Sequence, residues 1–129
     1  RWCPGKNAEG VLQELRDLVT PIAQAGGMQV DVSMEHEREP FETPLDDPIV
    51  NAVRDAHRGL FDSDPEEVGK RIVGDAHLYV HGSGVPTIYY GPSNETAHAD
   101  IETVSVTRVV DSARVYALAA MQYCGVAEA

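Results

Sequence analysis

VPTIYY, residues 85–90, is the stretch of the sequence that decides the expected fold class. It combines β-branched and aromatic side chains, which are the residue types enriched in strands. Gly84 bounds it on one side and the pair Gly91-Pro92 on the other. A short apolar run between turn residues is typical of a central strand buried on both faces. We therefore expect a sheet with this strand inside it.

The rest of the sequence alternates helical patterns with shorter strand patterns. Apolar residues that recur every three or four positions indicate helices, whereas strict alternation of apolar and polar residues indicates a half-buried strand. In chain order, the predicted elements are a helix at 8–25, a strand at 28–34, a helix from 46 to about 60, a short strand at 71–73, a helix at 76–80, the strand at 85–90 and a helix at 106–124. This order predicts an α/β fold.

Local signals support the helix starts and one boundary. Asn7 and Asp75 directly precede predicted helices, and their short polar side chains are suited to cap the first turn. Pro21 lacks an N–H and is expected to kink or end the last turn of the first helix. The acidic, proline-bearing stretch 35–44 has no periodicity, which is typical of a connection between structural units. We place the boundary after residue 37, giving predicted domains 1–37 and 38–129.

Composition excludes several classes of protein. The net charge of -11 over 129 residues argues against the basic surface that nucleic acid requires. No run approaches the roughly 18 apolar residues of a membrane helix, and no secretory signal pattern is present, so a cytoplasmic location is expected. Cys3 and Cys124 do not form a CxxC pair, which excludes a thioredoxin-like motif and a zinc ribbon. We expect buried or idle thiols, with a disulfide between them as the alternative that a reducing compartment disfavours. The opening RWCPG has no initiator Met, and we expect an internal piece of a longer protein.

Four of the five histidines have a simpler interpretation than catalysis. His36 lies in the acidic connection and His57 on the polar side of a predicted helix, so both are expected at the surface. His77 and His81 are four residues apart on a predicted helix, which is the spacing of two metal ligands in HExxH proteins. No Glu follows His77, and we favour packing or surface roles for this pair over metal binding.

His98 has a different context. It follows the predicted central strand in a loop that also holds Glu95, Asp100 and Glu102. Loops at the carboxyl ends of strands are where α/β sheets place their functional sites. A single His supplies one of the three or four ligands that zinc takes, so the loop alone predicts part of a site.

Four motifs occur together in the chain: GDA at 74–76, GVPT at 84–87, YGP at 90–92 and AHADIE at 97–102. Their order and spacing resemble the C-terminal signature of the M20 metallopeptidase family, which includes acetylornithine deacetylases, succinyl-diaminopimelate desuccinylases, aminoacylases and carboxypeptidases. The resemblance covers nearly the whole chain. It implies that residues 38–129 are the C-terminal half of a three-layer, zinc-peptidase-like catalytic domain, and that residues 1–37 are part of an α+β lid, or dimerisation, domain.

The resemblance also implies roles for individual residues. His98 falls on a ligand of one of two zinc ions, with cobalt as a possible substitute, and Glu102 would orient this ligand or support the structure. Arg1 falls on an Arg that contacts the substrate carboxylate, although a surface Arg at a strand end is the simpler alternative. Asp75 is expected to be structural and to cap its helix. Ala99 departs from the Thr that usually follows the ligand His, a change that removes no ligand.

The activity implied is hydrolysis of an amide bond in an N-acyl amino acid or short peptide by metal-bound hydroxide, with a Glu as general base. The family's His-x-Asp motif and its Glu-Glu pair are not matched in this chain, so we expect no activity from the chain alone. The partners implied are a small-molecule substrate and further copies of the chain in a homo-oligomer. The competing hypothesis is a non-catalytic module that dimerises.

Overall fold

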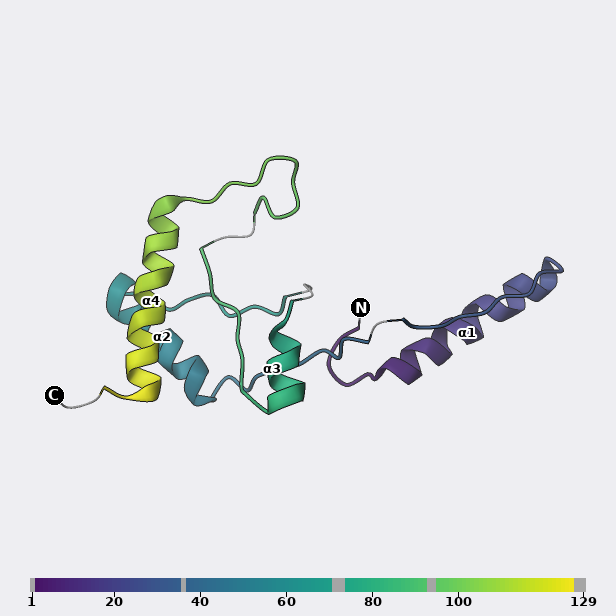
Figure 1. Cartoon of the computed structure of the whole chain (residues 1–129), viewed down its shortest axis with the longest axis horizontal. Coiled ribbons are helices and arrows are strands. Elements are labelled where there is room, and N and C mark those ends of the chain that lie inside the picture. The colour runs from purple at the N-terminus through teal and green to yellow at the C-terminus, as the bar shows by residue number, and fades with distance from the viewer. Residues whose placement is uncertain (1, 36, 71–73, 93–94, 127–129) are drawn as a thin grey trace. The chain divides into compact units, whose positions relative to one another are not determined.

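The computed structural model of the chain describes residues 2–35, 37–70, 74–92 and 95–126. Regular structure in these residues consists of α1 (Ala8–Ala25), α2 (Pro48–Phe61), α3 (Ala76–Ser83) and α4 (Val106–Cys124), without a strand (Figure 1). The predicted α/β fold class is therefore wrong. The expected three-layer architecture and the expected α+β lid are also wrong, because both require a sheet.

The two expected strands that fall in the described residues form extended segments without strand pairing. A strand is stabilised when a neighbouring strand pairs with its N–H and C=O groups. Here side chains bind several of these carbonyls instead: the Arg16 Nη2 donates to the Val32 oxygen at 3.0 Å, and the Thr43 hydroxyl donates to the Thr87 oxygen at 2.6 Å. The expected short strand at 71–73 lies outside the described residues.

The chain divides into two compact units. The first consists of Arg1–Glu42 and Arg71–Gly84, and the second of Thr43–Lys70 and Val85–Ala129. The predicted domain ranges, 1–37 and 38–129, stay a prediction. None of the helices in the described ranges is long and apolar enough to cross a membrane.

Local hydrogen bonds define both ends of α1. The Asn7 side chain accepts the Gly10 N–H at 2.8 Å, which confirms the predicted N-cap. At the other end, the Met28 N–H donates to the Ala23 oxygen at 2.8 Å while Gly27 takes a φ of +66°, the left-handed conformation that commonly ends a helix. Pro21 does not end the helix, which continues to Ala25.

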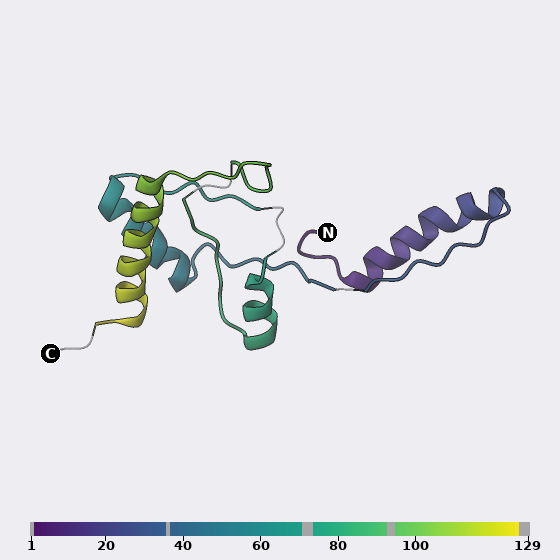
Figure 2. The same cartoon turned by 45° about the horizontal axis from the view of Figure 1, so that its top comes forward.

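After α1 the chain reverses, and residues 28–35 run back alongside the helix (Figures 1 and 2). The carboxylate of Glu39 then binds the beginning of the chain, since it accepts from the Trp2 Nε1 and from the Ala8 N–H, each at 3.2 Å. Asp75 immediately precedes α3, but its side chain makes no capping hydrogen bond, so that expectation is wrong. Its carboxylate instead pairs with Arg38 at 3.3 Å.

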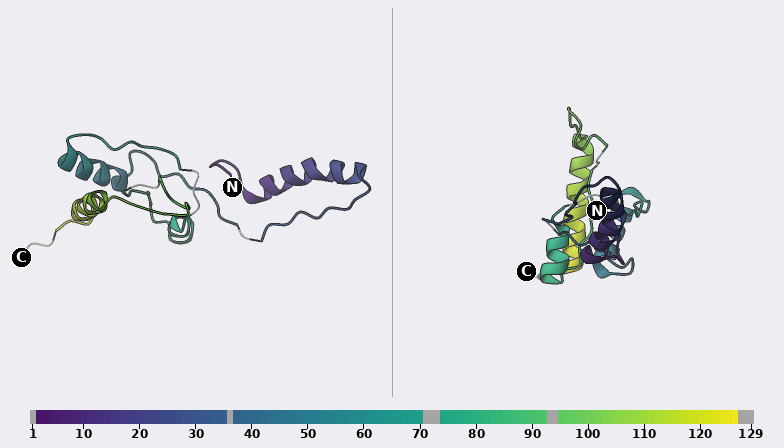
Figure 3. Two further views of the ribbon diagram at one scale, coloured as in Figure 1. Left: turned by 90° about the horizontal axis from the view of Figure 1, so that it is seen from above. Right: turned by 90° about the vertical axis from the view of Figure 1, so that its right-hand side faces the viewer.

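The core of the second unit lies between α2 and α4, which pack side by side (Figure 3). Val115 of α4 is fully buried, and small alanines around it allow the two helices to approach closely. The buried cluster consists of Ala52, Val53, Ala56, Val115 and Ala119, with Leu60, Ile88 and Tyr90 partly buried against it. The segment 85–90 therefore packs through alternate residues on a helix pair rather than inside a sheet.

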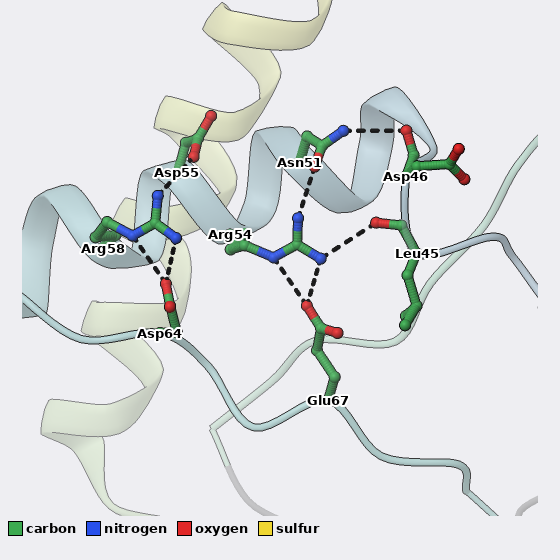
Figure 4. A network of polar contacts seen from close by, with 8 residues as sticks. All are labelled: Leu45, Asp46, Asn51, Arg54, Asp55, Arg58, Asp64 and Glu67. Carbon is green, nitrogen blue, oxygen red and sulfur yellow. Dashed lines mark hydrogen bonds and ion pairs between the residues drawn. The ribbon is translucent and has the colours of Figure 1, made fainter.

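Two arginines of α2 bind the segments that flank this helix (Figure 4). Arg54 donates to the Leu45 oxygen at 3.2 Å and, through Nε and Nη2, to one carboxylate oxygen of Glu67 at 2.9 and 2.5 Å. Arg58 binds Asp64 through Nε at 2.8 Å and Nη2 at 2.6 Å. The acidic stretch after α2 is therefore held against the helix by ion pairs.

Candidate functional site

The loop that carries His98 leads from the segment after Tyr90 into α4. Ser105 caps α4 by accepting the Arg108 N–H at 3.4 Å. Arg108 also pairs with Glu95 at 3.2 Å, although both side chains are more than half exposed. Exposed ion pairs contribute little stability, so this contact adds little to the stability of the loop.

A single threonine closes the loop on itself. The Thr96 hydroxyl donates to the Thr103 oxygen at 2.8 Å and accepts the Thr103 N–H at 2.9 Å. Within the closed segment, the Ala99 N–H donates to the Thr96 oxygen at 3.0 Å, which forms a tight turn. The third residue of this turn is His98, with a φ of +66°. Glycine and asparagine usually occupy a left-handed turn position of this kind.

Glu102 holds this turn through the backbone. Its carboxylate accepts the His98 N–H in a short hydrogen bond. This bond involves the main chain of His98 and not its ring. The His98 side chain is exposed, and its imidazole makes no hydrogen bond to any residue that the structure describes. The loop therefore presents His98 with an exposed side chain.

The other three histidines in the described ranges have their rings engaged. His77 Nδ1 lies 2.8 Å from the Gly74 oxygen, and His81 Nε2 lies 3.1 Å from the Pro40 oxygen. A carbonyl oxygen can only accept a hydrogen bond, so His77 Nδ1 and His81 Nε2 must each carry the proton and donate. His57 Nδ1 lies 2.8 Å from the Tyr90 hydroxyl. The preference for packing roles of the His77 and His81 pair agrees with these contacts. His36 lies outside the described residues.

The donor set in the described residues does not fit a complete metal centre. No group of three or more His, Cys, Asp or Glu side chains within these residues is placed to hold a metal ion. Two surface hollows in the described residues are lined by other residues: Pro48, Asn51, Ala52, Gln122 and Tyr123 in one, and Ala8, Glu9, Leu12, Arg16, Ser33, Met34 and Glu37 in the other. Neither includes His98.

The structure brings together two of the four predicted site residues, Glu102 and His98. Glu102 contacts His98, as described above. Asp75 belongs to the first unit and His98 to the second. Arg1 lies outside the described residues, so its proposed role stays a prediction.

Sequence reasoning missed a second polar constellation, which involves His57, Phe61, Tyr90 and Tyr116. His57 was expected at the surface, yet it is half-buried, with its ring centroid 4.7 Å from that of Phe61 and 6.0 Å from that of Tyr90. Burial, and then the neighbouring Tyr116 and Asp111, raise the pKa of Tyr90. The four-residue spacing of His57 and Phe61 on one helix was a visible signal. Their long-range partner Tyr90 was not.

Comparison with known proteins gives one match. The family model of peptidase family M20/M25/M40 matches residues 5–122. The matched range includes the GDA, GVPT, YGP and AHADIE motifs. No curated protein and no solved structure matches the chain.

Proposed function

Because the chain belongs to peptidase family M20/M25/M40, we propose that it contributes to a metal-dependent hydrolase that cleaves N-acyl amino acids or short peptides at an amide bond. The observation that supports this proposal is the accessible imidazole of His98, inside the matched range and inside the AHADIE motif. An exposed ring without a hydrogen bond to any of the described residues is available to a ligand or metal.

In this proposal His98 is a metal ligand and zinc is the metal, with cobalt as a substitute. An imidazole is a common ligand of zinc. Arg1 would bind the substrate carboxylate, for which a guanidinium is well suited. Residues 1–37 would cover the substrate and residues 38–129 would belong to the metal-binding part, near the C-terminal end of the family's motif order. The enzyme type would be a deacetylase or desuccinylase, acting in the cytoplasm as a homo-oligomer.

The chain alone would be inactive. Zinc in a catalytic site takes three protein ligands, and one imidazole supplies one of them. The experiment is incubation of the purified 129-residue chain with N-acetylornithine and Zn²⁺ or Co²⁺, with released acetate as the measurement. We expect none above the metal-only background. Metal-dependent acetate release that His98→Ala abolishes would contradict the claim of inactivity.

The ligand assignment has a separate test in a zinc titration followed by NMR of the histidine rings. We expect the His98 ring signals to respond at the lowest zinc concentration, because the rings of His57, His77 and His81 already have hydrogen-bond partners. His98→Ala should remove this first response. The matched control His77→Ala should leave it intact. A first response from His77 or His81 would show that His98 is not the preferred ligand.

A second candidate function is a non-catalytic module that self-associates. The observation in its favour is the apolar face of α1, on which Leu18 is 64% and Ile22 65% exposed, followed by the exposed Met28. Large apolar side chains that gather on a surface mark interaction sites. Sedimentation of the wild type and of Leu18→Glu discriminates the two: a dimer that the substitution dissociates supports the module, and a monomer in both opposes it.

A further inference from the structure

The loop from Thr96 to Thr103 is organised by its own hydrogen bonds. Thr96 closes it through both a donated and an accepted bond to Thr103, and Glu102 accepts the His98 N–H. These two side chains act on the main chain at different points. Thr96 sets where the loop begins and ends, whereas Glu102 sets the orientation of the peptide group at His98.

We propose that Thr96 and Glu102 are positioning residues that hold the backbone of His98 and thereby set the position of its exposed imidazole. The inference rests on the proposed function, in which His98 is the residue that binds metal. It assigns Glu102 a main-chain role, which differs from the usual arrangement in which a carboxylate orients a ligand imidazole through its other ring nitrogen.

The backbone conformation explains why His98 needs such support. A φ of +66° is left-handed, and for a residue with a Cβ this conformation costs roughly 1 kcal/mol or more. A hydrogen bond from an N–H to a charged carboxylate is stronger than one to a neutral acceptor, so the Glu102 bond offsets much of this cost. The left-handed φ also sets the direction of the Cα–Cβ bond and with it the position of the ring.

Thr96 acts differently, because its hydroxyl has to donate and accept at once. Valine has the same shape as threonine but can do neither, so Thr96→Val would open both bonds to Thr103. Serine retains the hydroxyl. The pair Thr96→Val and Thr96→Ser therefore separates hydrogen bonding from packing at a residue that is only partly buried. Glu102→Leu and Glu102→Gln form the corresponding pair, since glutamine keeps an acceptor oxygen.

The experiment is amide hydrogen exchange of the 129-residue chain without metal, read at the His98 N–H. Loss of the hydrogen bond to the charged Glu102 should raise the exchange rate about tenfold in Glu102→Leu, and loss of both loop-closing bonds to Thr103 should raise it about as much in Thr96→Val. Thr96→Ser and Glu102→Gln should stay within about threefold of the wild type. The Val115 amide, in the α2–α4 core, should exchange as in the wild type in all four variants, which shows that the fold persists.

A wild-type exchange rate at His98 in Thr96→Val and Glu102→Leu would overturn the proposal. So would a change of the His98 ring tautomer in Glu102→Gln, read from the ring ¹⁵N shifts, because Glu102 would then act on the ring. A zinc titration of the same variants adds a functional readout: Thr96→Val should weaken the His98 ring response about tenfold and Thr96→Ser should restore it. If zinc leaves the wild-type His98 ring unmoved while its amide is protected, the proposed function fails and the backbone role remains.

Discussion

The hydroxyl of Tyr90 lies 2.8 Å from the Nδ1 of His57, while the main-chain oxygen of Tyr90 accepts a short hydrogen bond from the Tyr116 hydroxyl. Tyr90 is therefore held at its side chain by α2 and at its backbone by α4. Its ring also meets that of Tyr116 edge to face, with centroids 5.9 Å apart. This arrangement anchors the segment that leads toward the His98 loop to both helices of the core.

Tyr90→Phe should destabilise the chain by about 1 kcal/mol, because it leaves the half-buried Nδ1 of His57 without its partner and retains the ring packing. Chemical denaturation measures the free energy of unfolding. Tyr123→Phe is the matched control in the same unit, since Tyr123 is about half exposed. Equal stability of the two variants would show that the His57 contact contributes nothing.

Val115→Ala should cost about 2 kcal/mol of unfolding free energy, because it deletes buried methyl groups at the fully buried centre of the α2–α4 interface and leaves a cavity. Val110→Ala, at a half-exposed position of the same helix, controls for the higher helix propensity of alanine. The difference between the two variants, measured by denaturation, isolates the packing contribution. A difference near zero would mean that this core is not formed in solution.

The helices were largely predictable because their signals are local. The predicted helices at 8–25 and 106–124 have the same limits as α1 and α4. Asn7 supplied a capping side chain that the structure uses. Asp75 has the right residue type at the right position, but Arg38 takes its carboxylate, so its cap could not be predicted from neighbouring sequence.

The strand predictions were wrong because strand formation depends on a pairing partner elsewhere in the chain. The run 85–90 has strand composition, and Ile88 and Tyr90 are indeed packed inward, but they pack on helices. Val85 and Tyr89 are about half exposed, which excludes the expected burial on both faces. A β-branched and aromatic run thus indicates an extended, packed segment, while its neighbour decides whether it becomes part of a sheet.

The candidate site was predictable only as a motif. The AHADIE string directed attention to His98 and Glu102, but the left-handed φ of His98 and the main-chain bond from Glu102 follow from loop geometry that no residue pattern specifies. The role of Thr96 was missed for the same reason. Its hydroxyl matters because Thr103 lies opposite it, seven residues along the chain.

Arg54→Lys should reduce stability by about 1 kcal/mol, because an ammonium cannot bind Leu45, Asn51 and Glu67 at once in the geometry of the guanidinium (Figure 4). Arg58→Lys is the matched control. Its side chain is 52% exposed, against 23% for Arg54, and its ion pairs should contribute about 0.3 kcal/mol. Denaturation of both variants tests the ranking, and a larger loss in Arg58→Lys would contradict it.

Glu39 makes the first unit sensitive to acid. Burial tends to raise the pKa of this carboxyl, but hydrogen bonds from the Trp2 indole, the Ala8 N–H and Glu37 outweigh it, so the pKa of Glu39 lies below its ordinary value of 4.5. The stability linked to this lowered pKa is present above about pH 4.5 and is lost as the pH falls through the pKa of the folded state.

Glu37 has the opposite pH dependence. The hydrogen bond shared with Glu39 raises the pKa of Glu37. The contribution of Glu37 to stability is therefore present below about pH 4.5 and is lost as the pH rises through the pKa of the folded state.

Trp2 is the only tryptophan, so its fluorescence isolates the Glu39 contribution from that of Glu37. We expect the emission to change as the pH falls below about 4.5, because protonation of Glu39 weakens the bond to the Trp2 indole. Glu39→Gln keeps an acceptor but cannot titrate, so its emission should stay constant over this range. Glu42→Gln, a substitution at an exposed carboxyl nearby, should retain the wild-type transition. An unchanged acid transition in Glu39→Gln would mean that another group controls the environment of Trp2.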